Sequence, residues 1–344
     1  MKKVYIKNIP IGDGSPIAVQ SMLNVPTADV SAALLQINRL RDAGCDIVRL
    51  AVNDNDAADG LKEIIKKSPL PIVADIHFDY RLALKSIAAG VDKVRINPGN
   101  LGGEDNAAQV AKACKSAHIP IRIGVNGGSL ENGLLEKCGG DLAKAMVESA
   151  KRHIDILNRN DFDDIVLSMK SSDVKTTINA YRLARDSFDY PLHLGVTEAG
   201  TTELGIVKSS IGIGSLLADG IGDTIRVSLT DDPVYEVYAA QNILKSLDMF
   251  GDYINVVSCP TCGRTKIDLI KIAGEVNNAT RNIRKKLKVA VMGCVVNGPG
   301  EAKDADIGIA GGDGCAVLFK KGEIIGKIAE DEIVPALLKE IEKL

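Results

Sequence analysis

The stretch IRIGVN at residues 121–126 is one of eight short aliphatic runs, each with a polar residue inside it, that recur through the first 245 residues. The other seven runs occupy residues 17–22, 47–52, 72–77, 94–97, 165–170, 192–197 and 225–229. Helix-like stretches separate the runs; between residues 31 and 43, for example, Leu34, Ile37 and Leu40 share one face. Eight strand–helix units in about 230 residues predict an α/β fold whose strands close into a (β/α)8, or TIM, barrel.

An open, doubly wound sheet is the alternative arrangement of alternating strands and helices. Such a sheet usually places a Gly-x-Gly-x-x-Gly turn after its first strand. Here the first run ends in Ser21-Met22 and continues into Leu23-Asn24, a stretch that contains no glycine. We therefore favour the closed barrel.

The repeating pattern stops near residue 247 and a different order of elements follows. We expect a strand that leads into Cys259, a helix over residues 265–284, two further strands, a hairpin near residues 320–322 and a final helix. These elements predict two domains: a substrate-binding barrel over residues 1–247 and a small α+β domain over residues 248–344.

Composition and charge narrow the class of protein. Hydrophobic residues make up 45% and charged residues 25%, the formal net charge is -3, and no apolar run approaches the roughly 18 residues of a membrane span. We expect a soluble, cytoplasmic protein with neither a nucleic acid nor a membrane as its partner. The basic run at residues 281–288 is most simply a solvated helix end, and the alternative is a docking patch for an acidic electron carrier or nucleic acid.

Four of the seven cysteines lie in the second domain, and two of them share one tight loop. This loop is Cys259-Pro260-Thr261-Cys262-Gly263, and a third cysteine, Cys294, lies where a predicted strand runs into a loop rich in glycine and proline. Two thiols from one loop and a third from a glycine loop are typical of a metal centre.

Zinc and an iron–sulfur cluster are the two interpretations of this centre. Structural zinc needs four nitrogen or sulfur ligands and would have to use Cys315, because none of the four histidines follows residue 193. A cluster accepts three thiolates and one weaker ligand, which Glu301 could supply seven residues after Cys294. A carboxylate is a hard ligand that a substrate oxygen could displace most easily. The residues alone leave Cys315 and Glu301 as comparable fourth ligands.

Charged residues recur in the predicted barrel strands. Barrel enzymes place their active sites at the carboxyl ends of the strands, and guanidinium groups bind phosphate oxygens with two hydrogen bonds. Four arginines together with a lysine, an asparagine and a serine form a set that suits a diphosphate: Arg49, Arg95, Arg122, Arg226, Lys170, Asn126 and Ser228. The acid–base candidates are Asp75, His77, His193 and Glu198.

Six segments of the chain closely resemble one family. They are residues 10–22, 95–99, 122–126, 193–200, 258–265 and 292–301, of which the last two contain the cysteines of the predicted centre. Together they resemble the (E)-4-hydroxy-3-methylbut-2-enyl diphosphate synthases of the non-mevalonate isoprenoid route, in the compact bacterial two-domain form. The resemblance extends over essentially the whole chain.

The resemblance implies one 4Fe–4S cluster per chain on Cys259, Cys262, Cys294 and Glu301. It implies an oxidoreductase that opens 2-C-methyl-D-erythritol 2,4-cyclodiphosphate and reductively dehydrates it with two electrons. The expected electron donor is flavodoxin or ferredoxin. The expected assembly is a homodimer in which the cluster domain of one subunit caps the barrel of the other.

The resemblance also assigns roles to residues in the barrel. It implies that the seven cationic and polar residues named above hold the diphosphate. Glu198 and Glu301 are the expected catalytic residues, with Glu198 as proton donor, and Asp75, His77, Asn97 and His193 are further expected members of the substrate site. Two rival classes are a non-redox barrel enzyme with a structural zinc and a non-catalytic iron–sulfur electron carrier.

Overall fold

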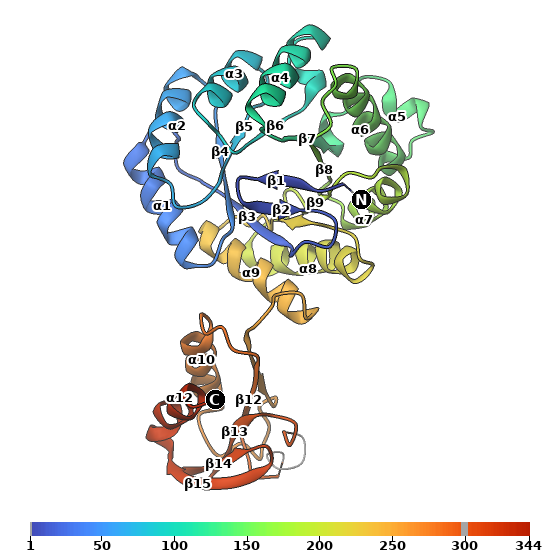
Figure 1. Cartoon of the computed structure of the whole chain (residues 1–344). Helices are drawn as coiled ribbons and strands as arrows, with labels where there is room; N and C mark the ends of the chain where they lie inside the picture. Colours follow the sequence, from blue (N-terminus) through green and yellow to red (C-terminus); the bar gives the residue numbers. More distant parts are fainter. Residues whose placement is uncertain (1, 297–301) are drawn as a thin grey trace. The chain divides into compact units, whose positions relative to one another are not determined.

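The computed structural model describes residues 2–296 and 302–344, and the chain divides into two compact units after Met249. The first unit is built on eight strands: β3 (Ala18–Met22), β4 (Ile47–Ala51), β5 (Ile72–Asp75), β6 (Lys93–Ile96), β7 (Ile121–Asn126), β8 (Ile165–Lys170), β9 (His193–Leu194) and β10 (Thr224–Ile225). They pair in parallel in the order β8-β7-β6-β5-β4-β3-β10-β9. Leu167 of β8 also pairs in parallel with Leu192, just before β9, so the two ends of the sheet meet (Figure 1). The predicted (β/α)8 barrel is confirmed.

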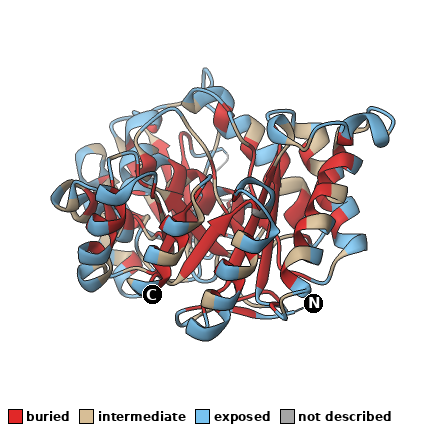
Figure 2. Ribbon diagram, turned by 90° about the horizontal axis from the view of Figure 1, so that it is seen from above, coloured by how far each residue is buried: buried red, intermediate tan, exposed pale blue. Residues whose placement is uncertain are grey.

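Helices surround these strands and alternate with them along the chain. They are α1 (Val30–Asp42), α2 (Asn55–Lys67), α3 (Tyr80–Ala88), α4 (Glu104–Ala117), α5 (Leu134–Lys137), α6 (Leu142–Asn158), α7 (Val174–Ser187), α8 (Thr202–Ala218) and α9 (Pro233–Ser246). Six of them begin after an aspartate whose carboxylate accepts a backbone N–H of the first turn: Asp29, Asp54, Asp79, Asp141, Asp173 and Asp232. In Figure 2 the strands are buried and the outer faces of the helices are exposed.

A hairpin that the sequence analysis missed lies at the amino-terminal side of the strands. It consists of β1 (Val4–Ile6) and β2 (Ile9–Ile11), which pair antiparallel. Ile6 and Ile11 are fully buried and pack in one cluster with Ala18, Ile47 and Val73 near the starts of β3, β4 and β5. The opposite end of the barrel, where the strands have their carboxyl ends, therefore carries the polar residues.

The last two barrel strands are shorter than the runs that predicted them. Runs at residues 192–197 and 225–229 form strands of only two residues each, His193–Leu194 and Thr224–Ile225. The remaining residues of each run lie outside these two short strands. They form part of the polar end of the barrel, where Thr197, Arg226 and Ser228 line a cavity.

The described residues of the second unit form a five-stranded mixed sheet with two α-helices. Its strands are β11 (Ile254–Ser258), β12 (Leu287–Met292), β13 (Ile307–Gly312), β14 (Cys315–Lys320) and β15 (Glu323–Ala329), in that spatial order. The first three pair in parallel and the last two antiparallel. Helices α10 (Leu269–Thr280) and α12 (Ile333–Glu342) pack on it through a core that includes Val276, Val289, Ile309 and Leu337. Helix α10 is shorter than the predicted span of residues 265–284.

Two local features of this unit follow from its sequence. Lys321 and Gly322 have φ angles of 47° and 82°, which suits the tight hairpin expected between β14 and β15. In the basic run, Lys285 Nζ donates to the carbonyl oxygens of Ile341 and Glu342, 3.0 Å from each, so it caps the carboxyl end of α12. Among the described residues, no helix has both the length and the hydrophobicity needed to cross a membrane.

Candidate active site

Eleven residues from the carboxyl ends of seven barrel strands line a cavity of about 120 Å³. Nine of them are predicted site residues, and Ser168 and Thr197 join them; the full set is Arg49, Asp75, His77, Arg95, Arg122, Asn126, Ser168, Lys170, Thr197, Arg226 and Ser228. Five are cations and one is a carboxylate. The lining of this cavity is therefore almost entirely polar and strongly positive.

Asp75 is the carboxylate at the centre of this lining. It is 2% exposed, accepts a hydrogen bond from Arg95 Nη1 at 3.1 Å and lies 3.5 Å from Arg49 Nε. Burial raises the pKa of its carboxyl, but the charges of Arg49 and Arg95 outweigh burial and hold that pKa at about 2. This one carboxylate, ionised near neutral pH, thus orients two arginines and leaves most of the positive charge uncompensated.

Arg122 is fully enclosed but only partly hydrogen-bonded. Its Nη1 donates to Ser168 Oγ at 2.9 Å, whereas Nε and Nη2, like Arg95 Nε, are buried without an acceptor in the described part of the chain. Burial, followed by the charges of Arg49 and Arg95, lowers the pKa of Arg122 well below its usual value. Unmet donors of a buried cation are costly, so this arrangement favours an anion that would accept from them.

Two glycines make room for the cations. A side-chain carbon on Gly124 of β7 would lie 2.4 Å from Arg95 Nε, and one on Gly195 would lie 2.6 Å from Lys170 Nζ. Any larger residue at either position would therefore push a cation out of its place. The need for space beside these cations explains why the strand runs IRIGVN and LHLGVT each contain a glycine at this position.

Three predicted residues do not line the cavity. His193 is fully buried, with Nδ1 2.7 Å from Thr224 Oγ1 and Nε2 3.5 Å from Lys170 Nζ. Asn97 accepts a hydrogen bond from the backbone N–H of Gly99 at 3.2 Å and so shapes the loop after β6. Glu198 is exposed and has a left-handed backbone with φ of 52°, a conformation that costs a non-glycine residue energy and is concentrated at functional sites.

Two buried charged residues near this cavity, Lys93 and Glu236, were not predicted from the sequence. Lys93 of β6 is fully buried with Nζ 3.5 Å from Gln20 Oε1, and burial, with Arg122 and Arg49 nearby, lowers its pKa well below the usual value. Its position two residues before Arg95 places it on the same face of the strand, a signal that could have identified it. Glu236 of α9 is 3% exposed and binds Arg226.

Acid is expected to destabilise the barrel through His193. Burial, then the charges of Arg122 and Lys170, lowers the pKa of His193 well below 6.5, so the folded chain keeps this ring neutral while the unfolded chain protonates it. The stability that this difference represents is present above about pH 6.5 and is lost as pH falls, by about 1.4 kcal/mol per pH unit. Urea unfolding of wild type and His193→Gln at pH 7.5 and 5.5 measures it; equal losses in the two proteins would contradict it.

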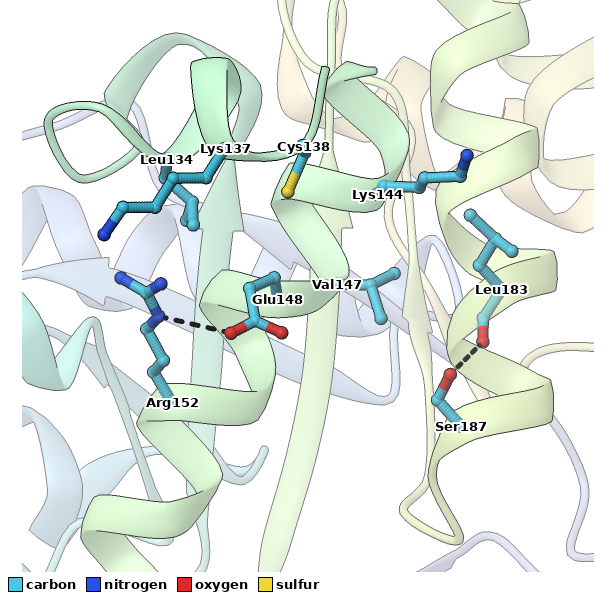
Figure 3. Close-up of a pocket in the computed structure, with 9 residues that line it drawn as sticks. All are labelled: Leu134, Lys137, Cys138, Lys144, Val147, Glu148, Arg152, Leu183 and Ser187. Carbon is cyan, nitrogen blue, oxygen red and sulfur yellow. Dashed lines mark hydrogen bonds and ion pairs between the residues drawn. The ribbon is translucent and has the colours of Figure 1, made fainter. Parts of the chain in front are cut away.

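A larger hollow lies on the outside of the barrel between α5, α6 and α7 (Figure 3). It has a volume of about 500 Å³ and includes Lys137, Lys144 and Arg152 in its lining. Two of these cations already have carboxylate partners, since Lys144 lies 3.4 Å from Asp141 and Arg152 lies 3.5 Å from Glu148. This hollow contains no predicted site residue, and we assign the chemistry to the smaller barrel cavity.

Three of the four cysteines of the second unit, Cys259, Cys262 and Cys294, lie on loops at the carboxyl ends of two adjacent parallel strands. Cys259 follows β11 directly, Cys294 comes two residues after β12, and the backbone N–H of Gly293 donates to Cys259 Sγ at 3.2 Å. Cys262 N–H donates to Thr265 Oγ1 at 3.1 Å, which closes the CPTCGRT loop. Hydrogen bonds from the Arg264 backbone N–H and side chain lower the pKa of the exposed Cys262 thiol.

These observations fit a thiolate-held group. Three soft sulfur donors from two neighbouring loops, one of them receiving an N–H hydrogen bond, suit an iron–sulfur cluster. Among the described residues, no three His, Cys, Asp or Glu side chains are close enough together to hold a metal ion. Glu301, the predicted fourth ligand, lies outside the described residues. Cys315 starts β14, with its Sγ 3.3 Å from the place of a side-chain carbon on Gly312.

Both units match models of one protein family. Residues 1–241 match the model described as the GcpE TIM-barrel domain, and residues 255–343 match the GcpE protein C-terminal domain. The chain belongs to the GcpE family. This finding confirms the resemblance that the six sequence segments indicated.

Curated relatives of this GcpE chain carry the name 4-hydroxy-3-methylbut-2-en-1-yl diphosphate synthase (flavodoxin). One from Caldanaerobacter subterraneus subsp. tengcongensis is 58% identical over 343 residues, which cover 100% of this chain and 97% of the relative. Another, from Clostridium perfringens, is 57% identical and covers 100% and 98%. A dihydropteroate synthase from Xanthomonas albilineans, solved with indole-2-carboxylic acid and 6-chloroguanine, has a TM-score of 0.52 at 14% identity, over 72% of this chain and 98% of that one. It supports the barrel fold alone.

Proposed function

We propose that this GcpE-family chain is a 4-hydroxy-3-methylbut-2-enyl diphosphate synthase. Its substrate is 2-C-methyl-D-erythritol 2,4-cyclodiphosphate, whose ring it opens and which it dehydrates by two-electron reduction, consuming two protons and releasing one water. The observation that carries this proposal is the barrel cavity, where buried guanidinium N–H groups find no acceptor among the described residues and five cations face one carboxylate. The names of the full-length relatives agree with it.

Different barrel residues would contribute hydrogen bonds and charge to binding of the diphosphate. Within residues 2–296 and 302–344, the Nε–Nη2 edge of Arg122 and the Nε of Arg95 have no acceptor. The Arg122 edge can bind a phosphate with two hydrogen bonds, and Arg95 Nε can add a third. Arg49, Lys170 and Arg226 add charge, and Asn126 and Ser228 add neutral donors. Because the donors are already fixed by Asp75, Ser168 and the surrounding strands, little reorganisation is needed when the diphosphate binds.

Proton transfer is assigned to Glu198. It is exposed on the loop that follows β9, and its left-handed backbone is the kind of strain found at catalytic positions. Its carboxyl group would protonate the departing oxygen of the substrate. Asp75, with a pKa of about 2, stays ionised near neutral pH and serves as counter-ion to the arginines instead.

The second unit would hold the redox group. Cys259, Cys262, Cys294 and Glu301 would bind one 4Fe–4S cluster, which when bound supplies electrons one at a time at low potential. The names of the relatives include flavodoxin, and we propose reduced flavodoxin as the electron donor, with ferredoxin as the alternative.

One anaerobic experiment tests this function. Protein purified without oxygen is assayed with the cyclodiphosphate and a chemical reductant, alongside counts of iron and sulfide. We expect a brown protein that forms 4-hydroxy-3-methylbut-2-enyl diphosphate. A colourless zinc protein would point to a non-redox barrel enzyme, and a brown protein with no affinity for the cyclodiphosphate would point to an electron carrier.

We also propose that the chain is a homodimer. Helix α8 exposes Leu204, Val207 and Ile211 at 54%, 50% and 52%, a spacing that puts all three on one side of the helix. A continuous apolar stripe of this kind is typical of a surface that a second copy covers. Val207→Glu should therefore shift the mass measured by light scattering from dimer to monomer. Leu35→Glu, at an exposed leucine on α1, is the control that should remain dimeric.

A further inference from the structure

Glu236 is a buried carboxylate whose bonding capacity is completely used. It is 3% exposed on α9, and its Oε1 accepts from Arg226 Nη2 at 2.9 Å and from the backbone N–H of Leu229 at 3.1 Å. Its Oε2 accepts from Arg226 Nε at 3.2 Å and from Ser21 Oγ at 3.1 Å. An ionised carboxylate accepts about four hydrogen bonds. Glu236 therefore has no site left for a substrate proton and is not placed for acid–base work.

These contacts link strands β3 and β10 beyond the point where their backbone hydrogen bonds end. Strands β10 and β3 pair only through Thr224 with Ala18 and Ile225 with Val19. Past that point, Glu236 links Ser21 of β3 to Arg226 and Leu229 of the segment that follows β10. It fixes the backbone from which Arg226 and Ser228 reach the cavity.

The same contacts decide which part of Arg226 faces the cavity. A guanidinium has five N–H donors. Glu236 takes one on Nε and one on Nη2, and Ser228 Oγ accepts one from Nη1 at 2.5 Å. Two N–H donors remain on a group that lines the cavity and is 17% exposed. Arg122, by contrast, has no acceptor at its Nε–Nη2 edge in the part of the chain that the structure describes.

We propose that Glu236 is a positioning residue that holds Arg226 so that its two remaining N–H donors point at the diphosphate. This role rests on the proposed function, because the ligand it serves is the diphosphate of the substrate. Without the carboxylate, the guanidinium would be free to turn, and the segment that carries Ser228 would lose its link to β3.

The direction in which Glu236→Gln changes the affinity for an anion separates a positioning role from simple charge balance. Glu236→Gln removes a negative charge beside the cavity, so charge balance alone predicts tighter binding of an anion. Its amide NH2 group would also face donors instead of accepting from them, so loss of positioning predicts weaker binding. We expect about tenfold to a hundredfold weaker binding of inorganic pyrophosphate, measured by calorimetry on the anaerobic, cluster-loaded enzyme.

Kinetics supply a second readout that a merely structural role would not move. Arg226 binds the diphosphate in ground and transition states alike, so KM for the cyclodiphosphate should rise while kcat stays within about threefold of wild type. A variant that only folds less well would show a lower kcat at unchanged KM. Glu236→Asp keeps the charge on a shorter side chain and should raise KM less; it decides the question if Glu236→Gln does not fold.

Glu63→Gln is the matched control. Glu63 is an exposed carboxylate on α2 that pairs with Lys66 at 2.7 Å, so its replacement changes the charge equally without touching the cavity. This variant should bind pyrophosphate as wild type does. Wild-type or tighter binding by Glu236→Gln would overturn the positioning role alone. A wild-type enzyme that neither binds pyrophosphate nor turns over the cyclodiphosphate would overturn the proposed function.

Discussion

Replacing Cys294 by serine is expected to remove the cluster and abolish turnover. Cys294 is buried, at 6% exposure, and follows Gly293, whose backbone N–H donates to Cys259 Sγ. The substitution therefore removes a buried thiolate ligand from the proposed centre. A serine hydroxyl is a poor ligand for iron in a thiolate site. Iron, sulfide and brown absorbance of the anaerobically purified variant should all fall to background.

Two comparisons make this result specific. Cys315→Ser should keep full iron and turnover, because the proposed ligand set does not use Cys315. Glu301→Ala should retain part of the absorbance and lose most turnover, since three thiolates remain. Full iron content in Cys294→Ser, or loss of iron in Cys315→Ser, would show that the ligand set is wrong.

Replacing Arg122 by methionine should make the chain more stable and nearly inactive. The free energy of unfolding should rise by about 1–4 kcal/mol, because a buried cation whose Nε and Nη2 have no acceptor among the described residues gives way to an apolar side chain of similar length. The same change removes the free guanidinium edge that would bind the diphosphate. We expect kcat/KM for the cyclodiphosphate to fall about 10²–10³-fold.

The outer hollow supplies the control for this variant. Arg152→Met removes an arginine that is paired with Glu148 on α6 and lies in the hollow of Figure 3. Its kcat/KM should stay near that of wild type. If Arg122→Met were destabilised while Arg152→Met lost activity, the assignment of the chemistry to the barrel cavity would be wrong.

The barrel and most of its cavity could be predicted from sequence because the information is local. Alternation along a strand puts Arg122 and Asn126 of β7 on one face, and it does the same for Ser168 and Lys170 of β8. Once eight such strands close in order, their carboxyl ends meet at one place. Nine predicted residues therefore line one cavity without any knowledge of their contacts.

The contacts that sequence could not supply are those between distant parts of the chain. Ser21 and Glu236 are 215 positions apart, and only closure of the barrel brings them to 3.1 Å. Glu236 lies in the first turn of α9, where acidic residues are common because they interact favourably with the helix dipole. Its sequence position therefore gives no sign of its contact with Arg226. The hairpin β1–β2 was missed because two three-residue strands are too short for their periodicity to be detected.

The surplus of positive charge at the barrel end also bears on how affinities are measured. Five cations and one carboxylate at the cavity attract any small dianion, including inorganic phosphate and sulfate from a buffer. The substrate must then exchange with such an ion, and an apparent dissociation constant reports the difference between two ligands. Buffers built on bulky zwitterions, at low ionic strength, would give the intrinsic value.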